Sequence, residues 1–374
     1  MTANTRTRPP FRADHVGSLL RPKKLLDARQ RWKEERFSRD ALTTLEDAAI
    51  LEVVAMQESV GLKSVTDGEF RRDDWYLDFI FRLNGIERGD ETFPIPFSGG
   101  DHFIATKINV TGRVSCPPGG IMSDHYAFLH HVTGETAKIT IPAPSMLRNL
   151  FVESTAISRE IYPDPEEFWV ELGQSYHDVL MGLAAIGCRY LQLDDVNTCL
   201  LCSDELRALN RAAGRDPDAL LEQFISVNNA AVADRPPDMA VTTHMCRGNY
   251  RSQWCSSGSY DAVAEKYFNA MNIDGFFLEY DSDRAGDFTP LRFLPKGKFA
   301  VLGLVTSKTP ELESRDDLKR RIDEAARYAP LEQLCLSPQC GFASTHQGNR
   351  LSEDDQRRKL ALVVEVADEI WGSA

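Results

Sequence analysis

Four residues carry metal-binding side chains at or just beyond the ends of short apolar runs. His244 and Cys246 lie two residues apart after one run, and side chains so spaced in an extended segment point the same way. Glu279 and Cys340 follow two later runs. Two thiolates, an imidazole and a carboxylate form an ordinary ligand set for Zn²⁺. The pattern favours a zinc site, although an isolated buried histidine or cysteine more often serves packing.

Three carboxylates follow two other apolar runs. Glu69 comes directly after Gly68, which permits a sharp turn. Asp194 and Asp195 follow the run YLQL. Asp195 is also well placed to cap the next helix, whereas Asp194 occupies an inward position. We expect inward carboxylates near a metal to bind an amine or to position a proton.

The elements that must position these residues are short apolar runs alternating with helical patterns. We expect eight strands, at residues 12–17, 63–66, 138–141, 189–193, 239–243, 275–278, 299–305 and 333–336. We expect helices at 42–60, 165–186, 218–232, 260–271, 316–328 and 352–371. Eight such βα units predict a (β/α)₈ TIM barrel, with the candidate residues on its C-terminal, active-site face.

The 374 residues are expected to form one barrel domain. We expect residues 1–11 to be a mobile N-terminal arm. His102–Ser115 alternates between apolar and polar residues, which predicts an inserted β-hairpin at about 98–118, after the second βα unit. Trp75 and Tyr76, which follow the second strand, could line a pocket or pack in the core.

Composition excludes several classes of protein. A net charge of −13 argues against a nucleic-acid binder and against adhesion to anionic membranes. The sequence has no apolar run of about 18 residues and no secretory h-region. Eight cysteines are too sparse for a disulfide scaffold. We therefore expect a cytoplasmic protein with reduced thiols; its oligomeric state is left open.

Seven segments resemble one family, the cobalamin-independent methionine synthases, and in particular their single-barrel, methionine synthase II-like branch. The segments are RADHVGSLLRP, VTDGEFRRDDW, LQLDDVN, THMCRGN, FFLEYDSDRAGDF, LGLVTSKTPELE and CLSPQCGFAST. The resemblance covers residues 11 to 372. It corresponds to the C-terminal catalytic barrel of the two-barrel enzymes.

The resemblance implies a zinc-dependent transfer of a methyl group to the thiol of homocysteine, giving methionine. Zinc lowers the pKa of a bound thiol, so that the acceptor is a thiolate at neutral pH. The implied zinc ligands are His244, Cys246, Glu279 and Cys340. The implied homocysteine contacts are Ser18, Glu69 and Asp194, of which the two carboxylates hold the ammonium group.

The half of the site that binds the methyl donor departs from the family pattern. Lys308 stands at or beside the family's proton-donating histidine, and positions near Pro144 and Leu200 replace two folate contacts. Lys308 and Arg113, with Asp195 and His15, are our candidates for donor-side or proton-transfer roles. The donor therefore stays open between a folate-type compound, a corrinoid-bound methyl group and others.

Two alternatives remain at this point. The same zinc–thiolate chemistry could join another thiol, such as coenzyme M, to an epoxide, although Glu69 and Asp194 would repel its sulfonate. Alternatively, the barrel could bind zinc and a thiol without catalysis.

Overall fold

The computed structural model describes residues 6–148, 150–151 and 153–373. Its centre is a parallel ladder of six strands in the order β5-β7-β8-β9-β10-β11. They are β5 (Ile139–Pro142), β7 (Tyr190–Asp195), β8 (Ala240–Met245), β9 (Gly275–Glu279), β10 (Phe299–Val305) and β11 (Leu334–Pro338). Nearly every residue of these strands is buried, as in a parallel sheet covered by helices on its outside.

The two remaining strand positions are short. β1 (Ser64–Val65) pairs in parallel with β4 (Thr136–Ala137), which leads into β5. The expected first strand, 12–17, forms one bridge from Ala13 to Leu336 on β11 rather than a ladder. On the side facing β1, the same segment accepts a 2.6 Å hydrogen bond at the Gly17 carbonyl from Thr66 Oγ1. The chain is therefore a (β/α)₈ TIM barrel, as the alternation predicted.

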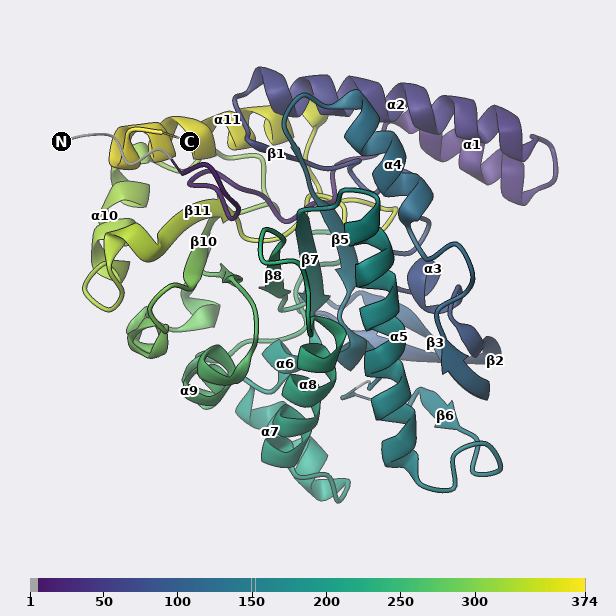
Figure 1. Ribbon diagram of the computed structural model, residues 1–374. Coiled ribbons are helices and arrows are strands. Elements are labelled where there is room, and N and C mark those ends of the chain that lie inside the picture. Colours follow the sequence, from purple (N-terminus) through teal and green to yellow (C-terminus); the bar gives the residue numbers. More distant parts are fainter. Residues whose placement is uncertain (1–5, 149, 152, 374) are drawn as a thin grey trace.

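Helices surround the strands (Figure 1). Six match the expected ranges: α2 (Arg39–Ser59), α5 (Pro165–Ala185), α8 (Pro217–Ala231), α9 (Asp261–Ala270), α10 (Arg315–Ala325) and α11 (Glu353–Trp371). Ser352 and Asp355 form a capping box that starts α11. Five further helices are α1 (Lys23–Lys33), α3 (Leu77–Ile80), α4 (Ser123–Val132), α6 (Asn197–Leu200) and α7 (Asp204–Ala212). Short 3₁₀ turns are η1 (Pro144–Leu147), η2 (Asp283–Ala285), η3 (Thr289–Phe293) and η4 (Leu331–Gln333).

A separate three-stranded sheet lies at the lower right of Figure 1, and two of its strands are inserted between α3 and α4. β2 (Asn84–Pro96) pairs antiparallel with β3 (His102–Ser115), and β6 (Thr155–Ile157) joins β3. The insertion therefore begins before the expected limit of about 98. Glycines and prolines in β2, together with a register shift between Arg88 and Thr92, obscure its strand pattern.

The expected mobile arm is only partly described, because residues 1–5 lie outside the described part of the chain. In its described portion, the Arg6 guanidinium lies 3.5 Å from the centre of the Phe299 ring and Phe11 is buried, whereas Thr7 and Arg8 are exposed. Over the described residues, no helix is both long enough and apolar enough to span a bilayer.

Candidate metal centre and substrate cavity

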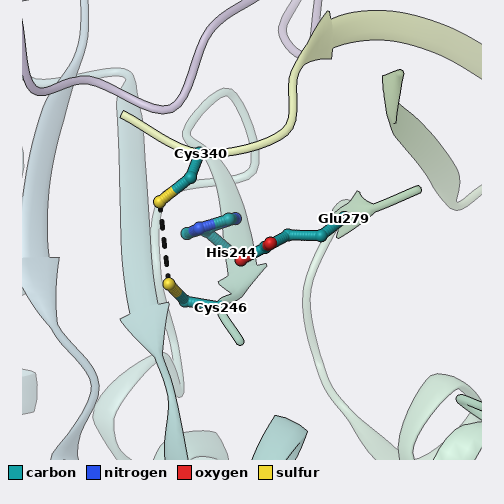
Figure 2. A group of neighbouring side chains, drawn as sticks. All are labelled: His244, Cys246, Glu279 and Cys340. Atoms are coloured by element: carbon teal, nitrogen blue, oxygen red, sulfur yellow. Dashed lines mark hydrogen bonds between the residues drawn. The ribbon is translucent and has the colours of Figure 1, made fainter. Parts of the chain in front are cut away.

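The four candidate metal ligands meet at the C-terminal ends of three barrel strands. His244 is the last residue but one of β8 and Cys246 directly follows that strand, Glu279 ends β9, and Cys340 lies just beyond β11. One ligand atom from each lies within 4.8 Å of the others, and all four residues are buried. Figure 2 shows the two cysteines on one side of His244, with Glu279 approaching from the other. The sequence analysis predicted this grouping.

The spacing of these side chains fits a tetrahedral metal ion. The Cys246 and Cys340 sulfurs are 3.6 Å apart, far longer than the roughly 2.05 Å of a disulfide. Two thiolates at about 2.3 Å from a tetrahedral zinc ion would be about 3.8 Å apart. Both ring nitrogens of His244 are buried without a hydrogen-bond partner. An imidazole nitrogen without a hydrogen-bond partner, lying beside two thiols, is free to bind a zinc ion together with them.

Ionisation of this cluster is strongly coupled. Burial alone would lower the pKa of His244, but the negative charges of Cys340, Glu279 and Asp194 raise it to about 9. The contact between the two thiols lowers the pKa of Cys340 and raises that of Cys246. Without a metal ion, the cluster therefore holds protons that metal binding must release.

Glu279 is held in place by groups that the sequence analysis did not single out. Its Oε1 accepts a 2.7 Å hydrogen bond from the Arg247 amide, and its Oε2 accepts one of 2.7 Å from Arg284. Burial would raise the pKa of Glu279, but the charges of Lys308 and Arg284 lower it to about 2. Arg284 follows Glu279 by five residues in the segment FFLEYDSDRAGDF, and that proximity was the available signal.

A cavity with about 130 Å³ of accessible volume opens beside the cluster. Its wall includes Ser18, Glu69 and Asp194, the three predicted substrate contacts, together with His244, Cys246 and Cys340. Glu279 lies behind this wall. The structure thus brings the predicted substrate residues and three of the four candidate ligands to one cavity.

The two cavity carboxylates are poised to bind a cation. Gly68 and Glu69 both adopt left-handed backbone angles, with φ of 65° and 63°, which turn the Glu69 side chain into the barrel. Glu69 Oε1 accepts from Thr140 Oγ1 at 2.9 Å, while its Oε2 is buried without a partner. Burial, with a further contribution from Glu69, raises the pKa of Asp194 to about 7, and burial also raises the pKa of Glu69. A cationic ligand would stabilise both as carboxylates.

Asp195 and His15 do not reach the cavity, which corrects their suggested donor-side or proton-transfer roles. The Asp195 side chain points away from the cavity because neighbouring strand residues face opposite sides of a sheet. Its Oδ1 instead accepts a 2.9 Å hydrogen bond from the Thr198 amide in the first turn of α6. His15 Nε2 lies 3.3 Å from the Ser64 carbonyl in a buried polar network. Burial and the nearby Lys138 charge lower the pKa of His15 to about 4, so it is neutral at pH 7.

Arg113 and Lys308 are also directed elsewhere. Arg113 is exposed on β3 and pairs with Glu167 and Glu171 of α5. Lys308 Nζ donates to Gln339 Oε1 at 2.6 Å and lies 3.9 Å from Glu279 Oε2. Neither side chain lines the cavity, so Lys308 supports Glu279 rather than facing a donor.

Aromatic residues form much of the remaining cavity wall. Trp75 and Tyr76 line it, and Tyr76 is also part of the hydrophobic core, against which Trp75 packs, so both expected roles are met. Phe97 and Phe103 of the insertion line it as well, and they pack against Tyr250. These three rings were not predicted, because contacts between an insertion and a distant loop leave no periodic signal in the sequence.

Comparison with known proteins places this architecture in a family. The model of the family described as the cobalamin-independent synthase, catalytic domain, matches residues 137–369. The chain belongs to this family. The matched part of the chain includes all four candidate metal ligands, whereas Ser18 and Glu69 precede it.

Individual relatives extend the likeness over almost the whole chain. YxjH, an uncharacterized protein of Bacillus subtilis, is 47% identical over 97% of this chain and 95% of its own. A crystal structure from Listeria monocytogenes, described as a proposed vitamin-B12-independent methionine synthase, is 37% identical with a TM-score of 0.78 and covers 98% of this chain and 100% of its own. A methionine synthase of Pyrococcus abyssi is 23% identical over 81% of this chain and 77% of its own.

Proposed function

We propose that this cobalamin-independent synthase is a zinc-dependent methyltransferase that moves a methyl group to the thiol of homocysteine and forms methionine. The observation that carries the proposal is the shared cavity: Glu69 and Asp194 line it together with His244, Cys246 and Cys340. Homocysteine carries an ammonium group at one end and a thiol at the other. The cavity therefore offers carboxylates to the ammonium group and a metal cluster to the thiol.

The zinc ion would be held by His244, Cys246, Glu279 and Cys340. When bound, it supplies the Lewis acidity that lowers the pKa of an acceptor thiol towards neutrality. The protein's own contribution is a fixed ligand geometry. Arg284 and the Arg247 amide orient the Glu279 carboxylate, as outer partners of metal ligands do.

The charges of the cavity favour homocysteine over a sulfonate thiol. Glu69 and Asp194 attract an ammonium group and repel a sulfonate. No described residue of the cavity wall is a lysine or an arginine, so a sulfonate has no cationic partner there. This argues against the alternative reaction, in which coenzyme M is joined to an epoxide.

The experiment that tests the proposal replaces one ligand at a time. Cys340→Ser and Cys246→Ser should each lose most of the bound zinc and the methionine-forming activity. Cys335→Ser is the matched control, because Cys335 is a fully buried thiol on β11 outside the cluster. Full retention of zinc and activity in both ligand variants would contradict the proposal.

Calorimetry separates the remaining alternatives. The zinc-loaded protein should bind homocysteine and should not bind 2-mercaptoethanesulfonate. Tight binding of the sulfonate thiol alone would favour the epoxide reaction. Homocysteine binding without methionine formation from any donor would favour a thiol-binding barrel without catalysis.

A further inference from the structure

Two buried polar side chains, Thr140 of β5 and Gln192 of β7, lie behind the cavity carboxylates. They are register partners on neighbouring strands, so their side chains point to the same side of the sheet. Gln192 precedes Asp194 by two residues and therefore shares its face. Both side chains are buried, and neither lines the cavity. Thr140 and Gln192, the anchor pair, thus support the cavity wall from within the barrel.

Each member of the anchor pair holds one oxygen of one carboxylate. Thr140 Oγ1 donates to Glu69 Oε1 at 2.9 Å, and Arg72 Nη1 lies 3.6 Å from the same oxygen. Gln192 Nε2 donates to Asp194 Oδ1 at 2.7 Å. Glu69 Oε2 is buried without a hydrogen-bond partner, and no described residue donates to Asp194 Oδ2. Each carboxylate therefore keeps one oxygen for a ligand.

The anchor pair also contacts the segment that carries Ser18. The amide of Gln192 donates a second hydrogen bond, 2.7 Å long, to the Val16 carbonyl. The methyl group of Thr140 lies against Gly17, where an added Cβ would come within 2.7 Å of it. The pair therefore contacts each of the three segments that carry the proposed homocysteine contacts.

We propose that Thr140 and Gln192 are positioning residues that set the preference of the cavity for a thiol carrying an ammonium group. They fix one oxygen of each carboxylate, so that the other oxygen stays available to the N–H groups of the ligand. The proposal rests on the methyltransferase function proposed above. A carboxylate that is already fixed loses little conformational entropy when it accepts a hydrogen bond. The anchor pair should therefore strengthen the binding of the ammonium group without touching the ligand.

Two thiols that differ only in the amino group test the proposal. Homocysteine and 4-mercaptobutanoate share the thiol, the carbon chain and the carboxylate. Calorimetry with the zinc-loaded wild-type protein should show tighter binding of homocysteine. Gln192→Met and Thr140→Val should each raise the dissociation constant of homocysteine about three- to ten-fold, the scale of one hydrogen bond. The dissociation constant of 4-mercaptobutanoate should stay at its wild-type value, because this thiol has no ammonium group to place.

Matched variants separate positioning from general damage. Thr140→Ser keeps the hydroxyl group and should retain the wild-type preference. Gln333→Met removes a buried amide that donates to two backbone carbonyls outside the cavity. Thr106→Val removes a hydroxyl group on β3 that accepts from Arg88. Neither of these two controls should change the binding of either thiol, and circular dichroism and zinc content establish that each variant is folded.

The comparison of the two thiols distinguishes the failure of this proposal from the failure of the function beneath it. A preference for homocysteine that narrows in Gln192→Met and Thr140→Val, and is kept in Thr140→Ser, supports the proposal. The full wild-type preference in both folded variants overturns it and leaves the methyltransferase function standing. Equal weakening of both thiols also overturns it, because the pair would then have a structural role only. A wild-type protein that binds the two thiols equally contradicts the function itself, and the positioning role with it.

Discussion

The Arg284 guanidinium donates a 2.7 Å hydrogen bond to Oε2 of Glu279, one of the four candidate metal ligands. Arg284 is itself fixed by Asp281 and lies over the Trp254 ring, 5.3 Å from its centre. Glu279 is fully buried, so its carboxylate depends on this pairing to stay ionised and oriented. Arg284 is therefore a positioning residue for the metal cluster.

Arg284→Met should weaken zinc binding about ten-fold, the scale expected when an outer partner of a metal ligand is lost. Competition with a chromophoric chelator measures the affinity. Arg292→Met is the control, because Arg292 pairs with Asp261, donates to the Thr289 carbonyl and lies over the Phe293 ring, and none of these partners belongs to the cluster. An unchanged zinc affinity in a folded Arg284→Met protein would contradict the positioning role.

Gly341→Ala should damage the substrate side of the site. A Cβ at Gly341 would lie 1.9 Å from Ser18 Oγ, so the segment beside Cys340 would have to move. We expect a loss of about 1–3 kcal/mol in the free energy of unfolding and weaker homocysteine binding. Gly134→Ala is the control, since its added Cβ meets no atom within 4 Å. Denaturant unfolding and calorimetry of both variants test this, and a Gly341→Ala variant as stable as Gly134→Ala would count against it.

Glu69→Gln and Asp194→Asn should each raise the dissociation constant of homocysteine. The loss of one hydrogen bond to a charged group costs about 1.5–3 kcal/mol, which corresponds to roughly 10- to 150-fold. Zinc content should be unchanged, because neither residue belongs to the cluster. Glu87→Gln, at an exposed position on β2, is the control. If calorimetry finds wild-type affinity in both variants, the carboxylates do not hold the ammonium group.

His15 should make stability depend on pH. Burial and the Lys138 charge lower its pKa to about 4 in the folded protein, against about 6.5 in the unfolded chain. Between these values the unfolded chain binds a proton that the folded protein does not, so the free energy of unfolding falls as the pH decreases through this window. The loss amounts to about 3 kcal/mol at most.

His15→Asn should flatten this pH dependence in urea unfolding series between pH 4 and 7. It should reduce the slope rather than abolish it, because burial also lowers the pKa of His125 to about 4. His102→Asn, on the exposed side of β3, should keep the wild-type profile. An identical slope in His15→Asn and wild type would show that His15 is not the buried neutral group described above.

Sequence periodicity predicted the part of the site that barrel geometry dictates. Parallel strands end on one face, so His244, Cys246, Glu279 and Cys340 had to lie near one another once the strands were identified. Strand alternation likewise separated Asp194, which lines the cavity, from Asp195, which caps α6. These inferences need only the spacing of residues within one segment.

The remainder of the site depends on contacts between distant segments, which spacing does not encode. Lys308 is turned away from the cavity by Gln339, and Arg113 is drawn outward by Glu167. The rings of Phe103 and Tyr250 meet only because the insertion folds over the cavity. Each of these outcomes was settled by tertiary packing rather than by local pattern.

X-ray absorption at the zinc edge shows whether the metal cluster receives the thiol of homocysteine. The zinc-loaded protein alone should show two sulfur neighbours, contributed by Cys246 and Cys340. After addition of homocysteine it should show three. Two sulfur neighbours before and after, at a homocysteine concentration that saturates binding, would contradict the account.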